Sequence, residues 1–228
     1  MNTTDPTAAA TKLRGALNSP SPSSRLQAAL TAGTNPAISY VDALIERCAV
    51  EPDFYVRDML TWALTRHPAS CVVPRLVEEV SGDVDQARSQ ALHTLSKIGD
   101  RSAWPAITST VLRDPHDDVA RSAWRAAVIL VPGGGETELA AELSTQLGRG
   151  DRDTRLSLSR ALAALGEAAL PVLAQAAEDG DDDARAHALA TEQLVRDPDE
   201  SFDAAIFEAQ RMVALNSAPA IRDDDADR

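Results

Sequence analysis

Aromatic, cationic and imidazole side chains recur at similar places in the sequence, and together they have the chemistry to bind a protein or a nucleic acid. Trp62 lies between Asp58 and Arg66 at intervals of four residues. An exposed tryptophan flanked by cations is typical of a binding hot spot, because rigid planar groups lose little entropy when they are buried. The full set of candidate binding residues is Asp58, Trp62, Arg66, Ser89, His93, Lys97, Ser122, Arg125 and Arg160.

Catalytic and metal-binding motifs are weak by comparison. His67 precedes Pro, His93 precedes Thr, His116 precedes Asp and His187 precedes Ala, so no His-Glu pair is present. The glycine run at residues 132–136 lacks the following Lys-Ser or Lys-Thr and the preceding strand of a phosphate-binding loop. The run therefore predicts a flexible linker between helices. We expect no catalytic residues, no metal and no cofactor. These observations favour a non-catalytic protein and leave open an active site assembled across repeats.

An internal repeat must position the candidate binding residues. Six arginines recur at intervals of 32, 31, 33, 34 and 30 residues: Arg25, Arg57, Arg88, Arg121, Arg155 and Arg185. Each after the first follows an acidic turn, at Asp53, Asp85, Asp117, Asp151 and Asp181. Each opens an Ala- and Leu-rich run at helical spacing. Units of this length cannot bury their apolar face alone and must stack on neighbours, which predicts a solenoid of hairpins of helix A, turn and helix B.

Proline and glycine residues predict where these helices begin and end. Pro74, Pro105 and Pro171 are expected in the opening turn of an A helix, where the missing N–H costs little. Gly99 is expected to end a B helix in the left-handed conformation. The segment 104–112, WPAITSTVL, is expected to be a single A helix.

The period also predicts which side of helix B faces the core. Counted from each repeat arginine as zero, the positions near three, six or seven, and ten are apolar, as at Leu60 and Leu64. Positions one, five, and eight to nine should face outward, and the candidate binding residues come from these positions, with Arg125 beside them. Trp62 then faces outward, whereas Trp104 and Trp124 are expected in the core.

The six repeat arginines have a structural interpretation. A cation in the first turn of a helix opposes the helix dipole, so each arginine should gain stability from a carboxylate. We expect it in the preceding turn or in the acidic turn of the adjacent repeat, which would form a ladder of ion pairs. Replacing Arg121 with alanine should then lower the melting temperature and leave binding per folded molecule unchanged.

Charge and composition limit the possible partners. The 228 residues carry a formal net charge of −13. Residues 178–228 hold fifteen acids and five arginines, a balance of −10 that leaves −3 for residues 1–177. The C-terminal third should therefore repel nucleic acid and anionic membranes. No apolar stretch has the length of a membrane span and no signal segment is visible, so we expect a cytoplasmic location. Cys48 and Cys71 are expected as buried thiols.

The repeat pattern in DDVARSAW and DVDQARSQALHTLSKIGD, with Asp, Val-Arg or Ala-Arg, Ala and Leu in order, resembles the HEAT-repeat family over about residues 23–198. Within that family it is most similar to short bacterial repeats related to phycobilin lyases. The resemblance implies an all-α, armadillo-like, right-handed α-α superhelix with B helices on its concave side. We expect a disordered segment at 1–7, one solenoid of about six repeats at 8–216, and an acidic disordered tail at 217–228.

The repeat period and the lack of a catalytic motif indicate one function, and the resemblance suggests a second of a different class. The first is a non-catalytic scaffold or adaptor that binds a protein or peptide on the concave B-helix face. The second is a nucleic-acid-binding or DNA-alkylation-repair-like protein, with Trp62, Trp124 and Asp58 near a base. Its phosphate contacts would come from Arg66, Lys97, Arg125 and Arg160. Acidity argues against this second class. The iron-binding deoxyhypusine hydroxylases carry His-Glu pairs that this sequence lacks, and a chromophore lyase is suggested by repeat similarity alone.

Overall fold

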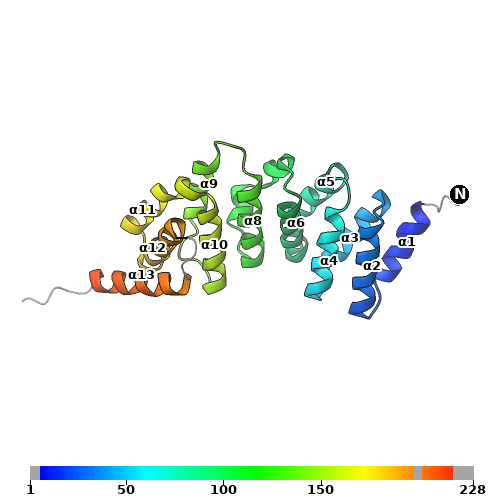
Figure 1. Ribbon diagram of the computed structural model, residues 1–228, viewed down its shortest axis with the longest axis horizontal. Coiled ribbons are helices and arrows are strands. Elements are labelled where there is room, and N and C mark those ends of the chain that lie inside the picture. Colours follow the sequence, from blue (N-terminus) through cyan, green and yellow to red (C-terminus); the bar gives the residue numbers. More distant parts are fainter. Residues whose placement is uncertain (1–5, 198–201, 218–228) are drawn as a thin grey trace, which may run out of the picture. The chain divides into compact units, whose positions relative to one another are not determined.

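The computed structural model describes residues 6–197 and 202–217, and every regular element within those ranges is helical. The all-α repeat architecture predicted from the sequence is therefore confirmed. The chain divides into two compact units, Met1–Gly135 and Glu136–Arg228, which are described separately. In each unit, helical hairpins follow one another in chain order (Figure 1). The handedness and continuity of the predicted solenoid stay predictions, and most of both predicted disordered ends lies outside the described residues.

In unit 1 the B helices pack in sequence, α2 on α4, α4 on α6 and α6 on α8, with the A helices beside them. Its elements are α1 (Pro6–Leu17), α2 (Pro22–Thr34), η1 (Ile38–Tyr40), α3 (Val41–Cys48), α4 (Phe54–Thr65), α5 (Ala69–Val80), α6 (Asp85–Ile98), η2 (Arg101–Ala106), α7 (Ser109–Leu112) and α8 (Asp117–Leu130).

Unit 2 has the same alternation, and its last helix packs on the B helix before it. Its elements are α9 (Glu136–Ser144), α10 (Arg152–Ala164), η3 (Gly166–Ala169), α11 (Leu170–Asp179), α12 (Asp182–Arg196) and α13 (Phe202–Ser217). A compact cluster of buried Ala, Leu, Phe and Val side chains joins α12 to α13. The glycine run lies between α8 and α9, where the two units meet in sequence.

The acidic turns begin the B helices in two different ways. Asp53, Asp151 and Asp181 are N-caps, each accepting a hydrogen bond from the backbone N–H three residues later. Asp85 and Asp117 are instead the first residues of α6 and α8. A carboxylate in the first turn still favours the helix, because it faces the positive end of the dipole.

The prolines correct two predictions about the A helices. Pro171 lies in the first turn of α11 as expected, but Pro74 lies inside α5. The segment 104–112 is not one helix, because Pro105 is inside the 3₁₀ helix η2 and the chain restarts at Thr108. The Thr108 hydroxyl caps the single turn α7. Gly99 ends α6 with φ of 72°, as predicted.

The apolar core follows the predicted positions of helix B. Leu60 and Leu64 are fully buried, and so is Trp124, whose indole N–H donates to the carbonyl of Leu112 at 2.8 Å. Trp104 is only half-buried. Cys48 is buried, and desolvation, with a smaller effect of nearby Glu51, raises the pKa of its thiol to about 12. Burial of Cys71 was a wrong prediction, since its side chain is half-exposed.

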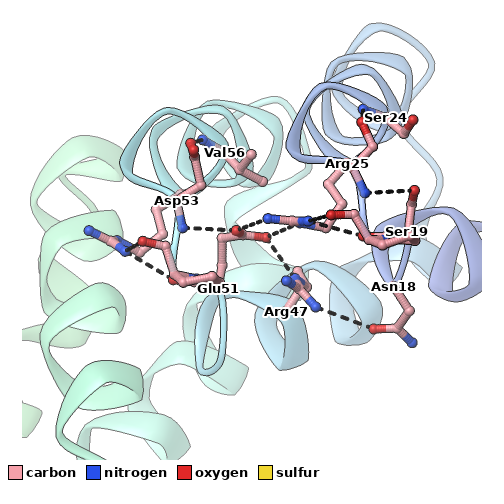
Figure 2. Close-up of polar contacts among 12 residues, drawn as sticks. Asn18, Ser19, Ser24, Arg25, Arg47, Glu51, Asp53 and Val56 are labelled. Carbon is pink, nitrogen blue, oxygen red and sulfur yellow. Dashed lines mark hydrogen bonds and ion pairs between the residues drawn. The ribbon is translucent and has the colours of Figure 1, made fainter.

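Glu51 is the centre of a buried polar network in unit 1 (Figure 2). Its carboxylate has no exposed surface and accepts two hydrogen bonds from Arg25, at 2.7 and 2.8 Å. Arg47 donates to it at 2.8 Å and the Asp53 backbone N–H at 2.9 Å. Burial alone would raise the pKa of Glu51, but these donors outweigh it and lower the pKa to about 2. The carboxylate thereby ties α2 and α3 to the start of α4.

Asp114 repeats this arrangement two repeats later. It follows Arg88 by 26 residues, as Glu51 follows Arg25, and it accepts from Arg88 at 2.6 Å. It also accepts from the backbone N–H two residues ahead, at His116. In both cases a buried acid lies in the turn that leads into a B helix, and it binds the repeat arginine of the previous B helix in the chain.

The other repeat arginines bind the turns mainly through backbone carbonyls or exposed acids. Arg57 donates to the carbonyls of Glu51 and Pro52, and Arg185 donates to those of Glu178 and Gly180. Arg155 pairs with Asp183 of the next repeat at 3.2 Å. Arg121 pairs with exposed Asp118 at 3.9 Å, an interaction worth about 0–1 kcal/mol, so the predicted loss for Arg121→Ala is small. The expected ladder thus combines ion pairs with carbonyl contacts.

A second polar motif joins neighbouring B helices in both units. In unit 1, Thr61 of α4 lies 3.4 Å from Thr94 of α6 and accepts from Gln90. In unit 2, Ser159 of α10 lies 2.7 Å from Thr191 of α12 and 2.9 Å from His187. Counted from the repeat arginine of each helix, Thr61 and Ser159 are at position four, and Thr94 and Thr191 are at position six. His187 is at position two, which Gln90 occupies in unit 1.

The partners of His187 define its tautomer. The Gly148 backbone N–H donates to Nδ1 at 3.0 Å, so Nε2 carries the hydrogen and faces the Arg155 carbonyl and Ser159. Burial, with a smaller effect of Arg155, lowers the pKa of His187 to about 4, although the Arg155 carbonyl opposes the shift. The ring is therefore neutral in the folded protein.

Among the described residues no single helix is long and apolar enough to cross a bilayer. One consecutive pair, Arg152–Ala164 with Gly166–Asp179, passes the same test of length and composition only when taken together, and it is bent by 118°. The cytoplasmic location stays a prediction.

Replacing Glu51 with glutamine should destabilise unit 1 by about 3–5 kcal/mol, because it leaves the buried Arg25 and the half-buried Arg47 without their charge partner. The matched change Glu46→Gln, which breaks the exposed pair with Arg14, should cost less than about 1 kcal/mol. Because folding lowers the pKa of Glu51, its contribution is present above pH 4.5 and is lost as the pH falls toward 2. Urea unfolding of both variants measures the difference, and equal losses would contradict the network's role.

Acid should destabilise unit 2 through His187. Its folded-state pKa lies below the unfolded value, so its contribution is complete above about pH 6.5 and is lost as the pH falls toward 4. Between pH 7 and pH 5 the loss should reach about 2 kcal/mol. His187→Gln, which copies unit 1, should remove this loss, whereas His187→Leu should cost about 1–3 kcal/mol at pH 7 by leaving its partners unpaired. Urea unfolding at both pH values checks this, and an unchanged acid loss in His187→Gln would show that other groups cause it.

Candidate functional site

One face of α4 presents an exposed stripe of aromatic and charged side chains. Trp62 is 37% exposed, with Asp58 one turn before it and Arg66 one turn after it. Tyr55, two turns before Trp62, is 73% exposed and lies on the same face by helical spacing. Sequence reasoning missed Tyr55 because it precedes the repeat arginine, although its seven-residue spacing from Trp62 is a usable signal.

Gly33 of the preceding B helix holds the Trp62 ring in place. A Cβ atom at Gly33 would lie 2.3 Å from Cζ3 and 2.7 Å from Cε3 of Trp62, so only glycine leaves room for the ring. One side of the indole therefore packs against α2 while the rest meets solvent. A tryptophan fixed in this way loses little further entropy when a partner covers it.

Two further B helices contribute the rest of the site. His93 and Lys97 follow each other by one turn on α6, and Arg125 on α8 donates to Nδ1 of His93 at 3.2 Å. Since an arginine can only donate, Nδ1 accepts, and the neutral ring carries its hydrogen on Nε2. We call the following residues the B-helix strip: Tyr55, Asp58, Trp62, Arg66, His93, Lys97 and Arg125.

The charges of the strip act on His93 from three helices. Partial burial lowers the pKa of His93, and the positive charges of Arg125 and Lys97 lower it further. The carboxylate of Asp58 opposes them and raises it. The imidazole thus lies within electrostatic reach of cations from α6 and α8 and of an anion from α4. A change in any of these charges would change the pKa of His93.

The structure places the other candidate binding residues elsewhere. The outward orientation predicted for Ser122 is wrong, because its side chain is only 8% exposed and its hydroxyl lies 3.0 Å from that of Ser89. These small side chains let α6 and α8 pack closely. Arg160 is exposed on α10 of unit 2, whereas the strip is defined by residues of unit 1. Trp124 is fully buried and has no face on which a base could stack.

Within the described ranges, no group of three or more His, Cys, Asp or Glu residues is placed to hold a metal ion. The imidazoles of His67 and His187 are buried in the packing, where their Nδ1 atoms contact backbone groups. The strip brings together an exposed aromatic ring, cationic donors and one titratable imidazole.

Part of the chain matches a known family of repeats. Residues 41–129 match the family model described as HEAT repeats, a range that includes most of the strip's three helices. No protein of curated function matches the sequence significantly.

The solved structures that are similar to this chain include the following three. An engineered protein is 18% identical, with a TM-score of 0.45, over 82% of this chain and 96% of that one. Human deoxyhypusine hydroxylase, in complex with glycerol, is 17% identical with a TM-score of 0.45, over 92% and 96% of the two chains. The CpcE–CpcF complex of the phycocyanin lyase of Nostoc is 17% identical with a TM-score of 0.35, over 90% and 94%.

Removing the positive charge of Arg125 should raise the pKa of His93, since Arg125 disfavours the second proton on the ring. Arg125→Gln and Lys97→Gln should each raise it, and Asp58→Asn should lower it further. The pH dependence of the His93 ring resonances in NMR spectra measures these shifts, with Arg101→Gln as a control outside the strip. Equal His93 titration curves in all four variants would contradict the electrostatic grouping.

Proposed function

Since this chain carries HEAT repeats over residues 41–129, we propose that it is a non-catalytic scaffold whose B-helix strip binds a segment of another protein. The observation that supports this most directly is Trp62, held half-exposed against Gly33 and followed by cations on three successive B helices. A fixed aromatic ring beside planar or extended cations is the composition of an interface hot spot.

The size of the strip fits a short peptide segment. Packed helices lie about 8–10 Å apart, so a strip across α4, α6 and α8 is about 20 Å long. An extended chain advances about 3.3 Å per residue, and about six residues would span it. The Trp62 ring then lies at one end of such a segment and Arg125 at the other.

The charge of unit 1 favours a protein partner over a nucleic acid. Residues 1–135 hold thirteen Lys and Arg and fourteen Asp and Glu, so this unit has no excess of positive charge. Several of the cations are already paired, as Arg25 is with Glu51 and Arg75 with Asp42. Nucleic-acid binding depends on cations that neutralise many phosphates, whereas a peptide needs only a few local contacts.

Affinity capture from the native host tests this proposal. The double variant Trp62→Ala/Arg125→Glu should lose its protein partner, with affinity reduced at least about 30-fold, because hot-spot residues each contribute about 2 kcal/mol or more. The matched control Phe207→Ala/Arg101→Glu also removes an exposed aromatic ring and reverses an exposed arginine, but at positions outside the strip. It should capture the same partner as the wild type.

Circular dichroism and melting curves should first show that both double variants are folded. Identical capture by the wild type and the strip variant would place binding on another surface. Recovery of nuclease-sensitive material that only the strip variant loses would instead support the nucleic-acid alternative.

A further inference from the structure

We infer, on the basis of the proposed function, that the partner segment is acidic and that its binding to the B-helix strip places a second proton on His93. The strip carries three cations, Arg66, Lys97 and Arg125, and one carboxylate, Asp58. It is therefore locally positive within a unit that has no excess of positive charge. Charge complementarity selects a segment rich in Asp or Glu.

His93 lies where the negative charge of such a segment would change its pKa. It lies 3.2 Å from a guanidinium nitrogen of Arg125 and one helical turn from Lys97. In the free protein Nδ1 accepts a hydrogen bond from Arg125, so the ring is neutral. The charged groups that act on the ring from the surrounding helices are Asp58 on α4, Lys97 on α6 and Arg125 on α8.

An acidic segment changes this balance. Its carboxylates would offset the positive charges of Arg125 and Lys97, which oppose protonation, and one carboxylate could take the Arg125 hydrogen bond in place of Nδ1. The freed Nδ1 then accepts a proton from solvent, and the resulting imidazolium adds a fourth cation facing the segment. An N–H bond forms at Nδ1 as an O–H bond of a hydronium ion in the solvent breaks, and nothing is oxidised or reduced.

Thermodynamic linkage turns this geometry into an observable. If binding raises the pKa of His93, then lowering the pH must tighten binding by the same coupling. Each unit by which the pKa rises gives up to a tenfold increase in affinity at low pH, and we expect a total change of about three- to tenfold. A segment without carboxylates would produce no such dependence.

The test uses the full chain and two fluorescein-labelled peptides, Asp-Asp-Phe-Asp-Asp-Asp and its analogue in which asparagine replaces each aspartate. Fluorescence anisotropy gives the Kd at pH values from 5.5 to 8.0, where the aspartates stay ionised. The wild type should bind the acidic peptide about three- to tenfold more tightly at pH 5.5 than at pH 8.0, and the asparagine peptide should bind weakly at every pH. NMR should show the pKa of His93 raised by the acidic peptide.

His93→Gln is the decisive variant, because glutamine can accept the Arg125 hydrogen bond but cannot take up the proton. The affinity of His93→Gln for the acidic peptide should be independent of pH. The quantity compared with the wild type is the change of affinity with pH, not the affinity at any one pH. Arg101→Gln, outside the strip, should keep the wild-type slope. Melting curves at each pH show that all three proteins are folded.

The outcomes separate this inference from the proposed function. An equal slope in the wild type and His93→Gln would overturn the proton coupling. If neither peptide binds but a protein is still captured through Trp62 and Arg125, the partner is not acidic, and only the inference fails. If a twelve-residue oligothymidine binds the strip in preference to the acidic peptide, the inference and the protein-binding proposal both fail.

Discussion

The buried contact between Glu51 and Arg25 is the constraint on which unit 1 depends. A carboxylate with no exposed surface is tolerated only when charged and backbone donors surround it, and four hydrogen bonds do so here. The donors come from different helices, so the carboxylate keeps its partners only when those helices are stacked. Asp114 and Arg88 repeat the contact at the same sequence separation. The repeat arginines therefore bind residues of the turns, and the cations that could contact a binding partner come from other positions.

The period of the arginines was enough to predict an all-α stack of hairpins, because stacking is the way such units bury their apolar faces. The partner of each arginine was harder to predict. Asp53 is one of the acidic-turn residues that the sequence predicts as partners of a repeat arginine, but its side chain accepts from the backbone of α4. The carboxylate of Glu51 pairs with Arg25 instead. This choice depends on which side chain points into the stack, and adjacent acidic residues in a turn look alike in sequence. Likewise, the sequence did not show that Pro74 would lie inside an α-helix while Pro105 lies in a separate 3₁₀ helix, because both prolines follow similar patterns.

In the candidate site, too, some features could be predicted from the sequence and others depend on how the helices pack. Helical phase correctly placed Trp62 on an exposed face, but the contact with Gly33 was invisible, since the two lie in different repeats. Ser122 has the outward phase and is nevertheless buried, because a small serine on each of α6 and α8 lets those helices pack closely, whereas Ser89 keeps part of its surface exposed. Exposure of a small side chain depends on the separation of neighbouring helices, whereas exposure of a large one is mainly set by its phase.

Two histidines of this chain are neutral for different physical reasons, and the difference decides which of them can respond to a ligand. His187 is fully enclosed, and its hydrogen-bond partners are backbone groups and a buried hydroxyl that no partner can reach. Its protonation is therefore linked to unfolding. His93 is only partly covered. Partial burial and the positive charges of Arg125 on α8 and Lys97 on α6, both exposed, keep it neutral against the opposing charge of Asp58 on α4. Those charges are the ones that a docked segment would compensate, so any dependence of binding on pH within unit 1 should arise at His93, while His187 affects only the stability of its own unit.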